Sequence, residues 1–153
     1  MKFPSHAVLV LPLVAAAWAT PALAQEGVTS YATTSAYADV AADLEDAIIN
    51  RGYVVDYHGL VGDMLKRTAA DVGSAVPLYK DAEFFQFCSA VMSRAAMEAD
   101  IGNVAFCPYV LFIYEAEATP GTVTVGFRRL PDGPGRDEVN ALLDEIAQEA
   151  AAQ

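Results

Sequence analysis

The hydrophobic positions follow two periodicities along the chain, one typical of helices and one typical of strands. Four segments have apolar residues at every third or fourth position, which gives one face of an amphipathic helix: 37–48, 64–72, 89–99 and 137–151. Five segments alternate or run apolar over a short stretch, as strands do: Val28–Thr33, Tyr53–His58, Glu83–Cys88, Tyr109–Tyr114 and Thr122–Arg129. The predicted order of elements is therefore β-α-β-α-β-α-β-β-α.

The fold class follows from the end of this order. The last two strands follow each other through the turn Thr119-Pro120-Gly121, so they are expected to form a hairpin. We therefore predict an α+β two-layer sandwich with a mixed or antiparallel sheet, and not a doubly wound parallel sheet. The segment Tyr109–Tyr114 is almost wholly apolar, which predicts a central strand covered on both faces.

Small polar residues stand where the predicted helices begin. Ser89 precedes the third helix, and Thr34 or Ser35 precedes the first. Their hydroxyl groups can accept hydrogen bonds from free backbone N–H groups, as can the carboxylate of Asp137 before the last helix. Gly52 can take the left-handed conformation that ends the first helix.

The first 24 residues have the three parts of a secretory signal peptide. Lys2 is the only charged residue before Glu26, an apolar run follows it, and Ala22-Leu23-Ala24 is a small-x-small cleavage site. The apolar run is too short for a membrane-spanning helix. We predict cleavage after Ala24 and an exported, periplasmic protein with no membrane association once the signal peptide is removed.

Composition narrows the function class without naming an activity. The chain has 153 residues and 54% hydrophobic residues, so residues 25–153 are expected to form a single folded domain. Its formal net charge of −11 disfavours nucleic-acid partners. The sequence has no nucleophile elbow, phosphate-binding glycine loop, dinucleotide fingerprint or H-E-x-x-H helix. We therefore expect no cofactor and favour a non-catalytic role.

The two cysteines, Cys88 and Cys107, are the first candidates for chemistry. In an exported protein they can form a structural disulfide. Alternatively, Cys88 is a reactive thiol beside a helix start and Cys107 is its resolving partner, or both thiols are buried and inert. If their strands were parallel neighbours, the two residues would lie at opposite ends of the sheet. A disulfide then requires antiparallel strands, or a segment Ile101–Phe106 that runs back along the sheet.

His58 is the only histidine after the predicted signal peptide. Strand alternation places it on the same face as Asp56, with Tyr53, Val55 and Tyr57 on the opposite face. A carboxylate beside an imidazole can orient a general base or a metal ligand, and otherwise the pair is a polar strand end in solvent. The spacing matches no standard zinc pattern, so no metal site is predicted.

Two further residues are candidates for ligand binding. Alternation places Arg128 on the face opposite Phe127, where its guanidinium can hold a small anion such as a carboxylate or a sulfur oxyanion. Its alternative role is an ion pair with one of the many acidic residues. Tyr109 is one of several strand tyrosines that can line a pocket.

The residues around the cysteines resemble a known family. Phe87-Cys88-Ser89-Ala90, Asp100 through Asn103, and Phe106-Cys107-Pro108-Tyr109 are similar to the exported branch of the domain of unknown function 302 family, as is Arg51-Gly52-Tyr53-Val54-Val55 upstream. The resemblance covers about residues 35–130, with the helix 137–151 beyond it. It implies a small α+β fold like that of the TATA-binding-protein class, often paired as homodimers. It implies no reaction.

Two hypotheses follow. In the first, the protein is a non-catalytic accessory module that holds a small ligand or an exported protein partner, with a structural disulfide. In the second, it is a thiol-dependent redox or sulfur-carrier protein acting through Cys88 and Cys107.

Overall fold

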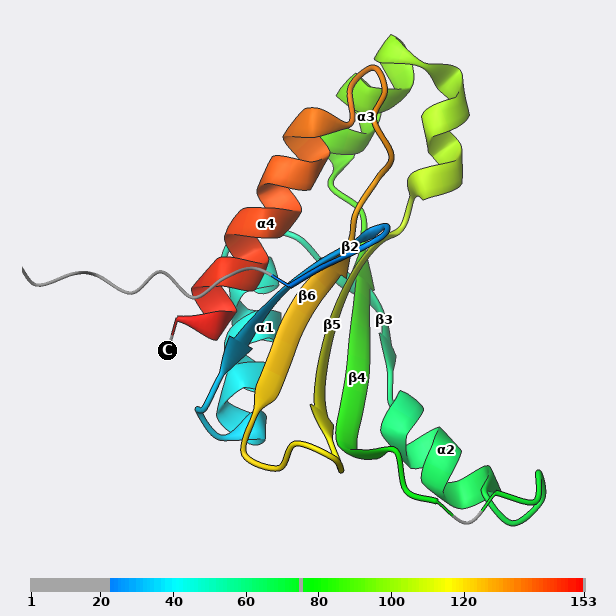
Figure 1. Cartoon of the computed structure of the whole chain (residues 1–153). Coiled ribbons are helices and arrows are strands. Elements are labelled where there is room, and N and C mark those ends of the chain that lie inside the picture. The colour runs from blue at the N-terminus through cyan, green and yellow to red at the C-terminus, as the bar shows by residue number, and fades with distance from the viewer. Residues whose placement is uncertain (1–22, 75, 153) are drawn as a thin grey trace, which may run out of the picture.

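The computed structural model describes residues 23–74 and 76–152, which form one antiparallel sheet and four α-helices (Figure 1). The strands are β1 (Leu23–Gln25), β2 (Val28–Thr33), β3 (Val55–Gly59), β4 (Tyr79–Phe87), β5 (Tyr109–Ala116) and β6 (Val123–Arg128). The helices are α1 (Tyr37–Ile49), α2 (Val61–Thr68), α3 (Ala90–Ala99) and α4 (Asp137–Ala151), with a 3₁₀ helix η1 (Ile101–Phe106) after α3.

The sheet confirms the predicted α+β two-layer sandwich. Its strand order is β1-β2-β6-β5-β4-β3, and every neighbouring pair is antiparallel. The hairpin of β5 and β6 forms as predicted. Helix α3 and η1 connect β4 to β5 without a crossover, since the two strands are antiparallel neighbours.

Helices α1 and α4 lie side by side on one face of the sheet (Figure 1). Between them and the strands lies the hydrophobic core, because alternate residues of each strand point to this face. Its largest fully buried side chains are Val40, Leu44, Ile48, Phe85, Phe87, Leu111, Ile113, Val123, Val125, Phe127, Leu143 and Ile146. The apolar faces predicted for the first and last helices are thus the faces that pack on the sheet.

The opposite face of the sheet is not covered by α1 or α4. Helix α2 packs against β4 at one end of this face, so most of the surface stays uncovered (Figure 1). The prediction that Tyr109–Tyr114 is covered on both faces is therefore only partly right. Tyr109, Leu111 and Ile113 point into the core, whereas on the other side Val110 is buried and Phe112 and Tyr114 are half-buried.

Two buried asparagines tie loops to helices. Asn140 of α4 accepts a hydrogen bond from the Leu130 backbone N–H at 2.9 Å and donates to the Leu130 carbonyl at 3.0 Å. Asn103 of η1 donates to the carbonyls of Ala96 and Pro134, at 2.7 and 2.9 Å. Its own carbonyl oxygen accepts from the Arg136 side chain at 2.7 Å. These contacts fix the ends of α3, η1 and α4 to one another.

The ends of the helices and strands agree with the predictions in one case and differ in the others. The Ser89 cap of α3 is confirmed, because the Ser89 hydroxyl accepts a hydrogen bond from the Met92 backbone N–H at 3.2 Å. Helix α1 instead begins after Ala36, which offers no capping side chain. Arg136, and not Asp137, precedes α4. Strand β4 begins four residues earlier than predicted, at Tyr79.

The predicted signal peptide lies outside the described residues except for its last two. Leu23 and Ala24 belong to β1 and pair with Ser30 and Thr29 of β2. Cleavage after Ala24 would remove two of the three residues of this edge strand.

Candidate functional site

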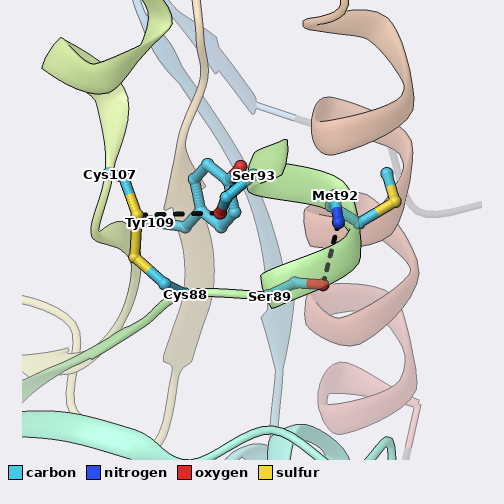
Figure 2. The surroundings of a disulfide bond; sticks show 6 residues. All are labelled: Cys88, Ser89, Met92, Ser93, Cys107 and Tyr109. Carbon is cyan, nitrogen blue, oxygen red and sulfur yellow. Dashed lines mark hydrogen bonds between the residues drawn. A yellow bond between two sulfur atoms is a disulfide. The ribbon is translucent and has the colours of Figure 1, made fainter. Parts of the chain in front are cut away.

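The two cysteines form a disulfide at one end of the sheet (Figure 2). Phe87, the last residue of β4, pairs directly with Tyr109, the first residue of β5. Because the two strands are antiparallel, Cys88 and Cys107 leave the sheet at the same end, and their Cα atoms are 6.2 Å apart. The antiparallel arrangement that a disulfide requires is therefore present.

The disulfide is half-buried beneath the first turn of α3. The Ser93 hydroxyl lies 3.7 Å from the Cys107 sulfur and donates to the Tyr109 hydroxyl at 3.2 Å (Figure 2). The peptide bond between Cys107 and Pro108 is cis. Tyr109 itself is only 3% exposed, and its ring packs edge-on against Phe87. The ring of this sequence-predicted ligand candidate is therefore part of the core.

His58 pairs with a residue that the sequence did not point to. A β-bulge between Val55 and Tyr57 shifts the alternation, so Tyr57 lies opposite Gln86 and His58 lies opposite Phe85. The expectation that Val55 and Tyr57 share a face is wrong for this reason. The imidazole stacks on the Phe85 ring at 4.4 Å, and its Nε2 lies 2.5 Å from the Glu83 carboxylate.

Glu83 joins His58 to the start of α1. The other oxygen of its carboxylate accepts a hydrogen bond from the Tyr37 hydroxyl at 3.1 Å. Burial and the nearby Glu83 charge raise the pKa of Tyr37 well above its usual range. Asp56, the predicted partner of His58, is exposed. In the described part of the chain, no group of three or more histidine, cysteine or acidic residues is placed to hold a metal ion.

The uncovered sheet face is hollowed into a groove of about 570 Å³, within the range of small-molecule sites. The strand register arranges its residues in rows across the sheet. In the central row, Ser30, Gly126, Phe112 and Phe84 are consecutive neighbours on β2, β6, β5 and β4.

Gly126 makes room for the Phe112 ring at the centre of this row. A Cβ atom at this position would lie 2.6 Å from the tip of the Phe112 ring and 2.8 Å from the Ser30 Cβ. The missing side chain thus lets the Phe112 ring lie down against the sheet. On one side of this row, Tyr114 pairs with Thr124 and Ala82, and Val61 and Leu65 of α2 close that end.

The other end of the groove carries a positive charge. Arg128 is exposed there, opposite Val28 on β2, and Gln86 lies opposite Val110 on the same level. Within the described residues Arg128 has no ion-pair partner, whereas its neighbour Arg129 lies 3.9 Å from Asp132. A smaller hollow of about 150 Å³ lies beyond Arg128, against Phe106 and Pro108.

The sequence-predicted residues therefore fall in three places. Cys88 and Cys107 meet in the disulfide, His58 meets Glu83, and Arg128 marks the end of the groove. The sequence pattern does not predict the aromatic lining of the groove, because an apolar run such as β5 is also typical of a doubly covered strand. The available signal is Phe84 and Phe112, apolar residues that alternate with the core residues Phe85 and Leu111.

Comparison with known proteins bears on the fold. The structure is similar to the crystal structure of the uncharacterized conserved protein DUF302 from Bacillus stearothermophilus, with a TM-score of 0.58 and 14% sequence identity. The match covers 84% of this chain and 95% of that chain. This chain has the fold of that DUF302 protein. No protein-family model matches the sequence, and no curated protein matches it.

The fold agrees with what the resemblance around Cys88 and Cys107 implies. The shared architecture extends over most of the described chain, so the likeness is not confined to the cysteine-bearing segments. Among the described residues, no helix is long and apolar enough to cross a bilayer.

Proposed function

We propose that this protein is an exported member of the domain of unknown function 302 family and a non-catalytic binding module. Its ligand site is the groove on the uncovered face of the sheet. The observation that carries this proposal is the groove itself, a hollow of about 570 Å³ with an apolar and aromatic lining and a charged end. Phe84 and Phe112 are half-buried neighbours in this lining, and contiguous apolar surface of this kind is typical of ligand-binding grooves and of protein interfaces.

The polar clusters elsewhere support binding over catalysis. The two sulfurs are bonded to each other, and the Glu83 carboxylate is occupied by hydrogen bonds with Tyr37 and His58. Both arrangements join neighbouring elements of the fold. They therefore have a sufficient structural explanation.

The export part of the proposal rests on the predicted signal peptide and on the disulfide, since disulfides persist in an oxidising compartment. N-terminal sequencing of the protein from a periplasmic fraction should begin at Gln25. A cytoplasmic protein that retains Lys2 would contradict export.

The binding site can be mapped by NMR with a library of small apolar and amphipathic compounds. We expect backbone amide shifts to cluster on β2, β4, β5 and β6 at groove positions such as Ser30, Phe84 and Phe112. The matched control is the core side of the same strands, where Phe85 and Val125 should move little. Shifts that cluster on α1 or α4, or no binding by any compound, would overturn the proposal.

A second function is favoured by one observation. Cys88 stands immediately before the cap of α3, where a helix N-terminus stabilises a thiolate. A dithiol reductant could then convert the disulfide to two thiols and itself become a disulfide, with two electrons and two protons moving to the sulfurs of Cys88 and Cys107.

Intact mass after alkylation separates the two functions. We expect no alkylated cysteine without reductant and slow, temperature-dependent alkylation with it, because the disulfide is half-buried. Rapid and reversible reduction of the native protein by a thioredoxin-like dithiol would favour the redox function.

A further inference from the structure

The structure points to the chemical class of the groove's ligand. We infer that the groove binds an elongated amphipathic anion, with its single carboxylate or sulfonate on Arg128 and its apolar body along the sheet. This inference rests on the proposed function. It adds the sign of the ligand's charge, its position and the direction in which the ligand lies.

The Arg128 end of the groove is positively charged, whereas the protein as a whole is negatively charged. The chain has a formal net charge of −11, and acidic partners are available to most of its basic residues. Arg51, Arg94, Arg129 and Arg136 each lie within 4.0 Å of a carboxylate oxygen. Among the residues that the structure describes, Arg67 and Arg128 have no such partner, and of these two only Arg128 lines the groove.

The neighbours of Arg128 are uncharged. On its level of the open face stand Val28, Val110 and Gln86. Glu83 also lines the groove, but its carboxylate contacts Tyr37 and His58 and not Arg128. A guanidinium presents parallel N–H donors that match a carboxylate or a sulfonate, and partial removal of water strengthens the pair. The Gln86 amide on the same level can donate a further hydrogen bond to the anion.

The rest of the groove fits an apolar body. From the level of Arg128 the groove runs along β5 toward α2, past Phe112 and Tyr114, a distance of about 13 Å for four residues of strand. The rings of Phe112 and Tyr114 are stacked, with 6.2 Å between their centroids. Burial of an alkyl chain against these rings removes apolar surface from water and so stabilises the complex.

The direction of the ligand follows from the two ends. Leu65 of α2 is apolar and closes the end far from Arg128. A ligand with one anionic end and one apolar end is therefore complementary to the groove in a single orientation. A dianion with charges at both ends, or a cation, is not.

The test uses three ten-carbon probes that differ only in the head group: decanoate, decanol and decyltrimethylammonium. Each is titrated below its micelle concentration into the purified full-length protein at neutral pH, by calorimetry and by NMR. We expect decanoate to bind at least about tenfold more tightly than decanol. Decyltrimethylammonium should bind most weakly, although the net charge of the protein favours it.

Two adjacent arginines supply the matched variants. Arg128→Gln should weaken decanoate binding at least about tenfold and leave decanol unchanged. Arg129→Gln removes the same charge one residue along, from a side chain that faces Asp132, and should leave both affinities within about twofold. Because Arg128 is exposed, its replacement is not expected to impair folding. Thermal unfolding of each variant checks this.

The outcomes separate the inference from the proposed function. Equal binding of decanoate and decanol, with NMR shifts at Phe112 and no effect of Arg128→Gln, overturns the anion inference and retains the groove as a binding site. Tighter binding of decyltrimethylammonium also overturns it. If no probe binds and the protein is a dimer whose subunits cover Phe84 and Phe112, both the inference and the small-ligand function are wrong.

Discussion

Single side chains join distant segments of this protein at several points. The amide of Asn140 forms both of its hydrogen bonds with one residue, Leu130, and so stands in for a strand partner at the point where the chain leaves β6. The disulfide of Cys88 and Cys107 joins the two ends of the connection between β4 and β5, which contains α3 and η1. Asn140 and the disulfide thus stabilise the fold by holding backbone segments together, and not by filling the hydrophobic core.

Replacement of Asn140 by alanine should lower the free energy of unfolding by about 2 kcal/mol, because the buried N–H and carbonyl of Leu130 lose their partners. Urea denaturation measures the change. The matched control is Asn50→Ala, at an exposed asparagine whose side chain makes no hydrogen bond with any residue that the structure describes. The expected change there is under about 0.5 kcal/mol. Equal losses of stability for Asn140→Ala and Asn50→Ala would contradict a stabilising role of the two Asn140 hydrogen bonds.

Replacement of Cys88 by serine should lower the free energy of unfolding by about 3 kcal/mol, since the disulfide closes a loop with a sequence separation of 19. Cys107→Ser and the double variant should lose the same amount. Ligand affinity in the groove should stay unchanged, because the bond lies beyond the end of β4. Little loss of stability together with loss of function would instead support the thiol-dependent role.

At the scale of elements, the bulge in β3 decides which groups meet. Without it, His58 would point to the open face with the groove residues. With it, the imidazole faces Phe85 and reaches Glu83, which also binds Tyr37 at the first residue of α1. Helix α1 and strands β3 and β4 are therefore joined by one carboxylate.

This junction predicts a pH dependence. Tyr37 keeps its proton in the folded protein to a higher pH than in the unfolded chain, since burial and Glu83 raise its pKa. The unfolded chain releases that proton near pH 10, so the stability that Tyr37 contributes is fully present below pH 10 and is lost as the pH rises further.

The comparison is between the protein and Tyr37→Phe from pH 7 to pH 11. At pH 7 the variant should be less stable by about 1 kcal/mol, the value of one hydrogen bond. Above about pH 10 the difference should shrink. The control is Tyr57→Phe, at an exposed tyrosine, which should change the free energy of unfolding little at pH 7. A Tyr37 difference that grows with pH would mean that the sign is wrong.

The order of elements could be predicted from sequence because it depends on local periodicity, and the Ser89 cap depends only on three following residues. The bulge, the Glu83 partner of His58 and the double hydrogen bond of Asn140 depend on contacts between distant segments. Strand alternation alone cannot reveal an inserted residue. The groove was missed for a related reason: an apolar strand face has the same pattern whether a helix or a ligand covers it.

For the whole molecule, the net charge has a long-range effect on the free energy of unfolding. With a formal net charge of −11, like charges repel across the folded surface, and the ion pairs described here lie mostly at exposed positions. Added salt shortens the screening length from about 30 Å at 0.01 M to about 10 Å at 0.1 M. Repulsion is therefore screened over most of the domain.

We expect the melting temperature to rise as sodium chloride increases over this range, measured by circular dichroism at pH 7. Near pH 4.3, where the net charge vanishes, the rise should disappear. A melting temperature that falls with salt at pH 7 would show that the ion pairs outweigh the repulsion.

Because side chains alternate along β5 and β6, the two faces of the sheet differ in the substitutions that they can accept. Val125 and Phe127 of β6 are buried in the core, whereas Phe112 of β5 and Arg128 of β6 line the groove. Substitutions at the groove positions can therefore change which ligand is bound while the core residues stay the same. A single scaffold of this kind can give rise to proteins that bind different compounds and have similar stability.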